Sequence, residues 1–363
     1  MELVILGRSR FDGKTSRESS QTERVQPPVC TDGDPMKAAE VGTERAAQSI
    51  ATIVAEGLAA KKKRLPAWLF YDAEGSALFE QITELDEYYP TRTEKKIFEQ
   101  NAEAMADTMV GGDPVTVVEL GAGTAQKTVL LLRALSRRVA TTFVPVDVSP
   151  SALAVAKARV LHELPGVKVN ELEATHEQAF RELRRLPGRK VVLFIGSSIG
   201  NYEDEEAVHL LSGVQRALGR DGVFILGTDL KKSPARLVPA YDDARGVTAR
   251  FNLNMLARIN RELGGRFELE RFRHVALWNE TESRIEMHLE SRMAQHVWVE
   301  SLGTSFRFEE GERIHTESSI KYDTAHVDSL LRASGLSRLR TFEDAERLFA
   351  VHLIRSIRLS EAL

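Results

Sequence analysis

Short apolar segments alternate with segments of helical periodicity from Val115 onward, and this alternation constrains the fold more than any other feature. Strands that are apolar along their whole length, separated by helices, are typical of a parallel sheet covered on both faces. With right-handed crossovers they predict a doubly wound, Rossmann-like α/β core. The predicted strands are Val115–Leu120, Thr142–Val148, Val167–Leu172, Val191–Ile195 and Val223–Leu226.

The pattern changes after Asp229. Helical periodicity runs through Ala235–Leu263, and three segments then alternate as antiparallel strands do. These segments are Phe267–Trp278, Arg284–Met293 and Trp298–Phe308. We expect a smaller α+β subdomain here, followed by a helix and by two apolar segments that return to the first sheet as an antiparallel edge. This last part consists of His326–Ser334, Leu339–Phe342 and Phe349–Arg355.

These changes divide the chain into four parts. Residues 1–40 are poor in large apolar side chains and cannot bury enough surface to offset the entropy of ordering, which predicts a flexible tail. Because Met36 opens the first helical pattern, a start at Met36 is an alternative. Residues 41–230 are assigned to a helical segment and the core, 231–320 to a substrate-binding subdomain, and 321–363 to the helix and strand pair.

Charge and cysteine content narrow the class of protein. A net charge of −4, from 49 basic and 53 acidic residues, argues against a general electrostatic grip on nucleic acid. No apolar run approaches the ~20 residues of a membrane-spanning helix, and basic residues interrupt the start of the chain. The single cysteine, Cys30, cannot form an internal disulfide. We expect a cytoplasmic monomer that binds neither nucleic acid nor membranes.

A glycine loop follows the first predicted strand. Gly121 and Gly123 allow a ligand to approach the backbone closely, whereas Gln126 occupies the place of the third glycine of the dinucleotide fingerprint. Asp147 ends the second strand, where a carboxylate can accept both ribose hydroxyls. This combination favours a nucleoside without phosphates, of which S-adenosylmethionine (SAM) is the common one. A structural turn that binds nothing is the alternative.

Several longer motifs lie in order along the chain. They are Leu65–Asp72, Gly75–Thr83, Glu87–Glu94, Glu119–Thr124, Gly196–Asn201, Gly227–Leu230, Tyr241–Asp243, Gly246–Thr248, Phe251–Asn252, Ile285–Met287 and Thr316–Ser319. Through them the chain resembles the histidine-specific methyltransferase family, which makes hercynine, the trimethylammonium betaine of histidine, in ergothioneine biosynthesis. The resemblance spans residues 60–355 and implies a class I methyltransferase core with an inserted substrate subdomain.

The resemblance also implies roles for individual residues. Those implied to bind SAM are Gly121, Gly123, Thr124, Lys127, Asp147 and Thr175. Those implied to hold the amine and carboxylate of histidine are Tyr88, Asn201, Tyr241 and Thr248, and those on the imidazole side are Tyr71, Met287, Glu317 and Ser319. Among these, Tyr71, Tyr88 and Asn201 are expected to act in catalysis. The chain departs from the family at Glu173–His176, where an Asp-Phe pair near the adenine is usual.

These residue types suit repeated methylation of an amine. Glu317 can accept a hydrogen bond from one imidazole nitrogen and Ser319 can serve the other, and two residues spaced by two face the same side of a strand. The ring faces of Tyr71 and Tyr88 tolerate a growing cation. A nearby sulfonium disfavours the protonated amine, so a dedicated base is not required. The nine histidines show no metal-ligand spacing, and no metal is expected.

The sequence therefore predicts SAM-dependent trimethylation of the α-amino group of L-histidine to hercynine. A rival interpretation keeps the chemistry but changes the acceptor to another free amino acid, such as tryptophan or a modified histidine. A nicotinamide-dependent oxidoreductase is disfavoured by the missing third glycine. A SAM-binding regulator without catalytic activity is the remaining alternative.

Overall fold

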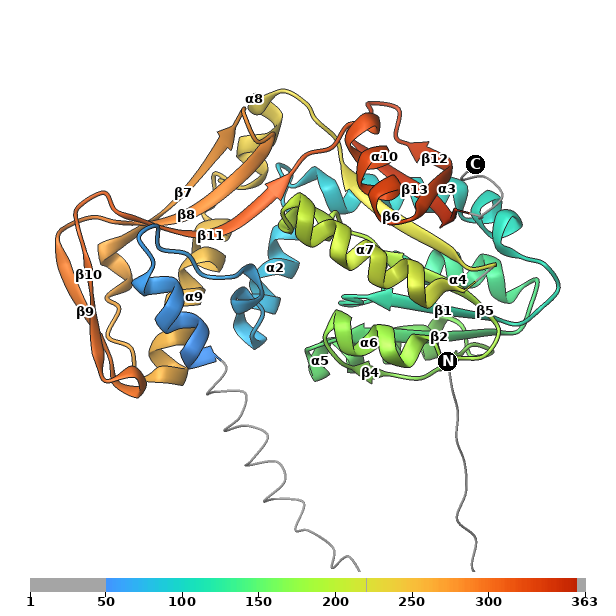
Figure 1. Ribbon diagram of the computed structural model, residues 1–363, viewed down its shortest axis with the longest axis horizontal. Coiled ribbons are helices and arrows are strands. Elements are labelled where there is room, and N and C mark those ends of the chain that lie inside the picture. The colour runs from blue at the N-terminus through green and yellow to red at the C-terminus, as the bar shows by residue number, and fades with distance from the viewer. Residues whose placement is uncertain (1–49, 220, 358–363) are drawn as a thin grey trace, which may run out of the picture. The chain divides into compact units, whose positions relative to one another are not determined.

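The computed structural model describes residues 50–357 except residue 220 (Figure 1). The predictions of a flexible tail over residues 1–40, of a start at Met36 and of an unpaired Cys30 lie outside the described residues. Residues 50–59 are helical, and the regular elements that follow alternate as the sequence predicts from residue 115 onward.

Within the described residues, an eight-stranded sheet forms the centre of the α/β core. Its order is β12-β13-β6-β5-β1-β2-β3, and β4 also pairs with β2. Neighbours from β6 to β3 are parallel, whereas β13 is antiparallel to both β6 and β12. The doubly wound core and its antiparallel edge are thus confirmed. The strands are β1 (Val115–Leu120), β2 (Thr141–Asp147), β3 (Lys168–Val169), β4 (Leu172–Glu173), β5 (Arg189–Phe194), β6 (Val223–Asp229), β12 (Leu336–Glu343) and β13 (Phe349–Ser356).

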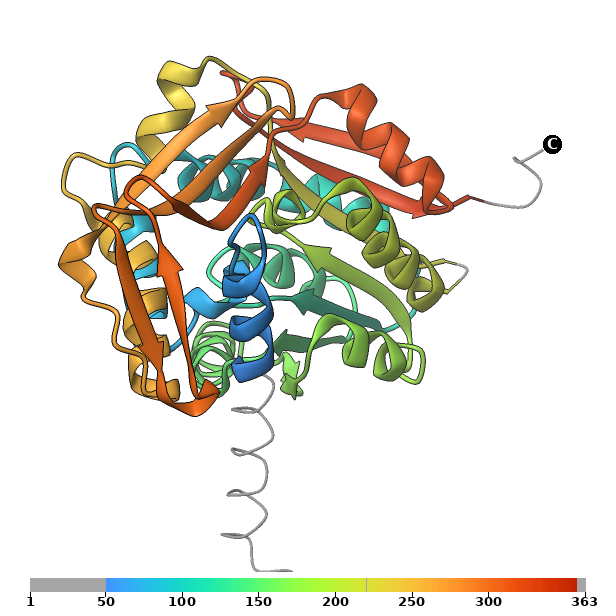
Figure 2. The same cartoon turned by 60° about the vertical axis from the view of Figure 1, so that its left-hand side comes forward.

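Helices cover both faces of this sheet (Figures 1 and 2). Val117 and Leu193 point into the core under the first set of helices, and Val118 and Val192 into the core under the second. Each such buried aliphatic side chain contributes about 1.5–3 kcal/mol, which explains why the strands are apolar throughout. The first set is α3 (Tyr89–Met109), α4 (Thr128–Ser136) and α5 (Pro150–Glu163), and the second is α6 (His176–Leu183), α7 (Asp204–Leu218) and α10 (Thr324–Ala333).

A further hydrophobic core, beside the two that flank the eight-stranded sheet, lies under a three-stranded antiparallel sheet of order β11-β8-β7. It combines side chains from residues 237–314 with side chains from residues 50–89. The N-terminal segment therefore packs with the later subdomain, although the sequence division groups it with the α/β core. The elements here are α2 (Ala73–Thr83), α9 (Val247–Leu263), β7 (Phe272–Asn279), β8 (Arg284–Ser291), β9 (Gln295–Val299), β10 (Thr304–Phe308) and β11 (Arg313–Ile320), with the 3-10 helix η1 (Ala67–Phe70).

Four predicted elements are interrupted. The strand predicted over Phe267–Trp278 begins only with β7 at Phe272, after the 3-10 helix η4 (Leu269–Arg271). The helix predicted over Ala235–Leu263 is wrong, because α8 (Pro234–Leu237) and η3 (Val238–Ala240) end before α9 begins. The strand predicted over Trp298–Phe308 is wrong as well: the chain reverses through η5 (Glu300–Leu302) between β9 and β10. The predicted strand Val167–Leu172 is split into β3 and β4. In each case local polar turns override an apolar periodicity that is continuous in sequence.

Candidate active site

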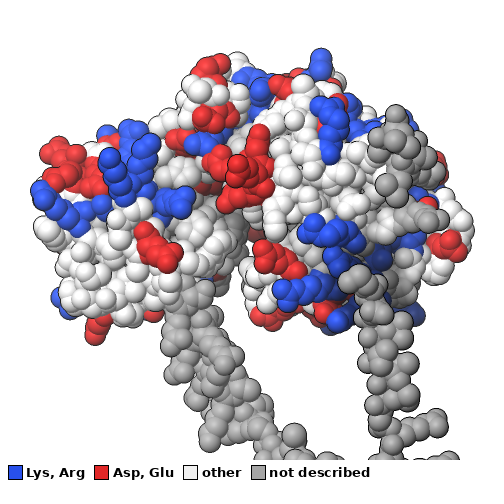
Figure 3. All heavy atoms as spheres, viewed as in Figure 1, with Lys and Arg blue, Asp and Glu red and all other residues white. Residues whose placement is uncertain are grey.

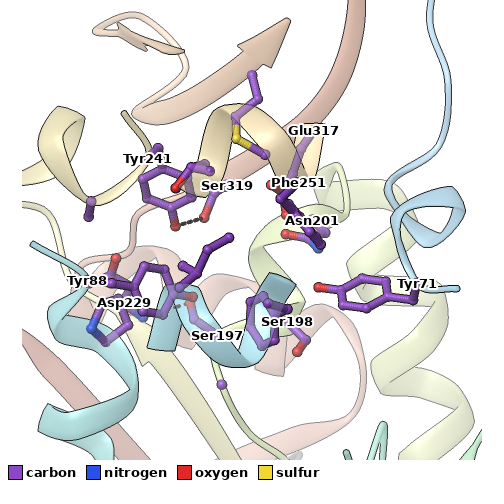
Figure 4. A pocket seen from close by; sticks show the side chains of 17 residues that line it. Tyr71, Tyr88, Ser197, Ser198, Asn201, Asp229, Tyr241, Phe251, Glu317 and Ser319 are labelled. Atoms are coloured by element: carbon purple, nitrogen blue, oxygen red, sulfur yellow. Dashed lines mark hydrogen bonds between the residues drawn. The ribbon is translucent and has the colours of Figure 1, made fainter. Parts of the chain in front are cut away.

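A pocket lies where the carboxyl ends of β5 and β6 meet β8, β11 and the aromatic residues of the N-terminal segment (Figure 4). All eight residues that the sequence assigns to the substrate line this one pocket. They come from parts of the chain separated by as many as 248 positions, so the fold alone brings them together. These residues are Tyr71, Tyr88, Asn201, Tyr241, Thr248, Met287, Glu317 and Ser319.

A tight turn after β5 carries Asn201 into the pocket. Gly196 and Ser197 both have left-handed backbones, with φ of 79° and 60°, and the 3-10 helix η2 (Ser198–Asn201) follows them. The Ser197 hydroxyl accepts the backbone N–H of Asp229 at 2.9 Å, which holds the turn against the end of β6. Strained turns of this kind concentrate at functional sites, and this one aims the Asn201 amide at Glu317 (Figure 4).

Glu317 and Ser319 project from the same face of β11, as the sequence predicts from their spacing. Burial raises the pKa of the Glu317 carboxyl to about 7, even though the nearby Lys321 cation and a hydrogen bond from Asn201 both lower it. The carboxyl therefore changes its charge close to neutral pH. Once ionised it can only accept hydrogen bonds, and an imidazole N–H is one possible donor.

Three tyrosines line the same pocket as this carboxyl. Burial raises the pKa of Tyr71, Tyr88 and Tyr241 well above 10, and the charge of Glu317 adds to the shift in each case. Tyr71 exposes 36% of its surface, yet its hydroxyl points into the pocket (Figure 4). These phenols remain protonated at neutral pH. They can donate hydrogen bonds and present ring faces to a cation, but they are poor bases.

Tyr241 is held by hydrogen bonds to both its side chain and its backbone. Its hydroxyl lies 2.8 Å from the Ser319 hydroxyl, and its carbonyl lies 2.8 Å from His274 Nε2. Because burial lowers the pKa of His274, this ring is neutral and donates one N–H to the carbonyl, while its Nδ1 lies 2.9 Å from the Asn252 amide. Tyr241 is consequently a rigid part of the pocket wall.

Asp243 caps the start of α9 and thereby positions Thr248. Its carboxylate accepts the backbone N–H groups of Val247 and Thr248 at 2.9 and 2.7 Å, and these bonds lower its pKa. Such caps satisfy the free amides of the first helical turn. The motif Tyr241–Asp243 followed by Gly246–Thr248 therefore lies between the end of η3 and the start of α9, at the pocket wall.

The glycine loop after β1 forms an open cradle beside this pocket. Gly121 and Gly123 have φ of 69° and 49°, and a Cβ placed on either would meet no atom within 4 Å. The Asp147 carboxylate at the end of β2 accepts the backbone N–H groups of Gly123 and Ser149 at 3.1 and 3.0 Å. An open glycine turn next to a fixed carboxylate fits a nucleoside whose ribose hydroxyls reach the strand end.

The remaining residues predicted to bind the cofactor have local partners. Lys127 pairs with the fully buried Glu94, and the Thr124 carbonyl accepts Arg159 Nε at 2.9 Å. The hydroxyl of Thr175 accepts the N–H of Gln178 and its own N–H is bonded by the Gln178 side chain, so Thr175 caps α6. None of the six lines the pocket of Figure 4. Their contact with a cofactor stays a prediction.

A model of the family described as histidine-specific, SAM-dependent methyltransferases matches residues 50–356. This chain belongs to that family. A histidine N-alpha-methyltransferase of Mycolicibacterium smegmatis is 42% identical over 315 residues, which cover 86% of this chain and 97% of that protein. The ergothioneine biosynthesis protein 1 of Neurospora crassa is 30% identical over 83% of this chain and 34% of its own length. A 4-dimethylallyltryptophan N-methyltransferase of Penicillium roqueforti is 28% identical over 81% of this chain and 89% of that protein.

Family membership makes this methyltransferase SAM-dependent, and the glycine cradle and Asp147 fit that cofactor. The alternative of a nicotinamide enzyme is thereby excluded. Among the described residues, no three His, Cys, Asp or Glu side chains gather to hold a metal ion. The described part of the chain also contains no helix long and apolar enough to cross a membrane.

Two charged residues of the methyltransferase pocket escape the sequence reasoning. Asp229 lines the pocket with 1% of its side chain exposed, and the wholly buried Lys321 pairs with it at 2.9 Å. A signal for Lys321 exists, because it continues the spacing of two that links Glu317 and Ser319. A signal for Asp229 is its place at the carboxyl end of a parallel strand.

Proposed function

We propose that this methyltransferase transfers three methyl groups from SAM to the α-amino group of L-histidine and so forms hercynine, the first step of ergothioneine biosynthesis. The convergence of Glu317 and Ser319 with Tyr88, Asn201 and Tyr241 in one pocket supports this most strongly. Glu317 and Ser319 offer partners for an imidazole, and Tyr88, Asn201 and Tyr241 offer hydroxyl and amide groups for a carboxylate. The name of the Mycolicibacterium smegmatis relative agrees with this acceptor, and that of the Neurospora crassa relative agrees with ergothioneine biosynthesis.

In this proposal Tyr88, Asn201, Tyr241 and Thr248 hold the amine and carboxylate, and Tyr71, Met287, Glu317 and Ser319 surround the ring. A neutral imidazole has one donor and one acceptor nitrogen. Glu317 accepts from the first and Ser319 donates to the second. A site built on such bonds rejects rings that leave its buried polar groups unpaired.

SAM, when bound, supplies an electrophilic methyl group on a sulfonium. The pocket residues orient the substrate and exclude water, which favours an in-line transfer. Tyr71 and Tyr88 stay protonated because burial raises the pKa of each, so neither is a base. The amine proton leaves to solvent, directly or through a tyrosine hydroxyl that releases its own proton to solvent as it accepts one. The ring faces of Tyr71 and Tyr88 accept the quaternary ammonium product, which has no N–H left to donate.

A different amino-acid acceptor is the second candidate. An indole ring can donate its N–H to Glu317, but it has no nitrogen that could accept from Ser319. Tryptophan therefore leaves one hydroxyl of the pocket without a ring partner. The relative whose name gives dimethylallyltryptophan as its substrate shares only 28% sequence identity with this chain.

The cytoplasmic location, the monomeric state and the absence of nucleic-acid and membrane partners belong to the same proposal. On the face seen in Figure 3, basic and acidic side chains lie next to one another, unlike the single-sign surface that grips a phosphate backbone. Size-exclusion chromatography with light scattering tests the monomer. A mass near twice 40.5 kDa would contradict it.

Mass spectrometry of products tests the function. Purified protein is mixed with SAM and all common amino acids, and methylated species are identified. Trimethylated histidine as the sole product is the expected outcome. Methylation of another amino acid would replace the acceptor and require a different account of Glu317, whereas SAM binding without any methylated amino acid would favour the regulator.

A further inference from the structure

Lys321 is a lysine with no exposed side-chain surface directly behind the substrate pocket. The backbone explains how it reaches this place. After β11 the chain runs alongside the end of β6, where Tyr322 donates its N–H to the Asp229 carbonyl and accepts the Lys231 N–H, both at 2.9 Å. Lys321 therefore faces the Asp229 carboxylate and two hydroxyls of the pocket wall.

The hydrogen bonds of Lys321 are complete. An ammonium group has three donors and no acceptor. These donors reach Tyr241 Oη at 2.8 Å, Ser319 Oγ at 2.7 Å and Asp229 Oδ2 at 2.9 Å. No donor is left for a substrate, so Lys321 can influence binding only through these three groups.

The bonds from Lys321 set the direction of the two hydroxyls. Each hydroxyl has one proton to donate and two lone pairs to accept with, and Lys321 occupies a lone pair on both oxygens. In the structure Tyr241 and Ser319 also bond to each other, which uses one of their two protons. An incoming group with lone pairs can take both protons, because both oxygens stay anchored to the ammonium. Each oxygen keeps one further lone pair, but a cationic N–H that used it would lie beside the Lys321 ammonium, and the like charges disfavour it.

We propose that Lys321 is a positioning residue that makes Tyr241 and Ser319 hydrogen-bond donors and so selects a substrate that offers an acceptor to each. This assignment rests on the proposed function, in which the two acceptors are the carboxylate and the unprotonated ring nitrogen of L-histidine. The bound ring is then the neutral tautomer whose N–H faces Glu317. An imidazolium would bring a second N–H and a positive charge to Ser319, next to the Lys321 ammonium, and that charge disfavours it.

The charges around Lys321 agree with this role. Lys232 approaches Asp229 from the other side at 2.5 Å and contacts the Tyr89 hydroxyl at 2.8 Å. Two ammonium groups thus flank one carboxylate, and the cluster carries an excess positive charge close to Tyr241, where the substrate carboxylate is placed. The other ionisable groups on the pocket side are Glu317 and the phenols of Tyr71 and Tyr88.

Calorimetric titration of histidine in the presence of S-adenosylhomocysteine tests the proposal. Lys321→Met is expected to weaken histidine binding about tenfold to a hundredfold, the value of a charge-assisted hydrogen-bond network. In a background that lacks both hydroxyls, Tyr241→Phe with Ser319→Ala, the same change is expected to cost less than about threefold. An equal loss in both backgrounds would overturn the proposal, because Lys321 would then act independently of the hydroxyls.

Lys232→Met is the matched control, since it also removes a lysine from Asp229 without touching either hydroxyl. Its effect on histidine binding should be the same in both backgrounds. Nitrogen-15 NMR of wild-type enzyme with ring-labelled histidine needs no variant. One protonated and one unprotonated ring nitrogen support the proposal, and a bound imidazolium overturns it. If wild-type enzyme binds no histidine, the proposed function fails and the inference with it; binding with equal losses refutes the inference alone.

Discussion

Lys127 forms an ion pair with Glu94, and the same buried carboxylate accepts the backbone N–H of Gly196. Glu94 comes from α3, Lys127 precedes α4 and Gly196 follows β5, so one side chain joins three elements. It connects the loop assigned to the cofactor with the turn that carries Asn201. The Glu94 carboxylate thereby links the part of the site assigned to SAM with the part assigned to histidine.

Glu94→Gln should disrupt this connection. It leaves the Lys127 ammonium without its counter-charge in a partly buried place, and breaking a buried pair typically costs about 3–5 kcal/mol. Chemical denaturation should show a loss of this order, and SAM affinity should fall. Glu99→Gln is the control, because Glu99 on the same helix forms only an exposed pair with Lys95 at 3.8 Å. Equal stability of the two variants would contradict the role of Glu94.

Gly200→Ala should separate Asn201 from Glu317. A Cβ at Gly200 would lie 2.8 Å from the carbonyl oxygen of Ile320, so η2 must move away from β11. Overpacking of this kind costs about 1–3 kcal/mol of stability, and we expect KM for histidine to rise more than KM for SAM. Gly166→Ala, where a Cβ meets no atom within 4 Å, is the matched control in steady-state kinetics. A Gly200→Ala enzyme with unchanged KM for histidine would refute this prediction.

Asp147→Ala should weaken cofactor binding without affecting histidine directly. The change removes the acceptor for Gly123 and Ser149 as well as the proposed ribose partner. Loss of two hydrogen bonds to a charged group corresponds to a rise of at least about tenfold in the Kd for SAM. Fluorescence or calorimetric titration measures it. Glu171→Gln, which loses only an exposed pair with Lys157, should bind SAM as the wild type does. Tight SAM binding by Asp147→Ala would move the ribose site elsewhere.

Glu317→Ala should change the choice of substrate. Without the carboxylate an imidazole N–H is left unpaired, and kcat/KM for histidine should fall at least about a hundredfold. Turnover of amino acids with apolar rings should fall less, so that the ratio moves towards tryptophan, particularly when Met287 is also made smaller. Competition assays by mass spectrometry measure that ratio. Ser318→Ala on the opposite face of β11 is the control. Unaltered histidine selectivity in Glu317→Ala would show that the imidazole binds elsewhere.

The pH dependence of histidine binding should report the same carboxyl. Its pKa is raised to about 7, and the ionised form accepts the ring N–H more strongly than the protonated form does. Histidine affinity should therefore be full above about pH 8 and fall as the pH drops through 7, by at most about tenfold per pH unit. Glu317→Gln cannot titrate, so subtracting its profile removes the titration of free histidine itself. Identical profiles for wild type and Glu317→Gln would contradict this assignment.

Sequence patterns were sufficient where short-range physics decides the outcome. The strands β1, β2, β5 and β6 are buried on both faces, and their apolar runs predict them closely. Interruptions were not predictable in the same way. The break before α9 depends on the Asp243 cap and on the backbone of Gly246, and the reversal between β9 and β10 depends on Gly303. Apolar periodicity continues through both and conceals them.

For the site, the ordered motifs identify the family, and the spacing of Glu317 and Ser319 places them on one face, because a strand alternates its side chains. Tertiary packing brings these residues together with Tyr71 and Asn201 in one pocket. It also decided that Lys321 lies buried against Asp229, a pairing between residues 92 positions apart. The physical reason is that burial and electrostatic partners are set by which elements pack together, and no local pattern specifies the distance between distant segments.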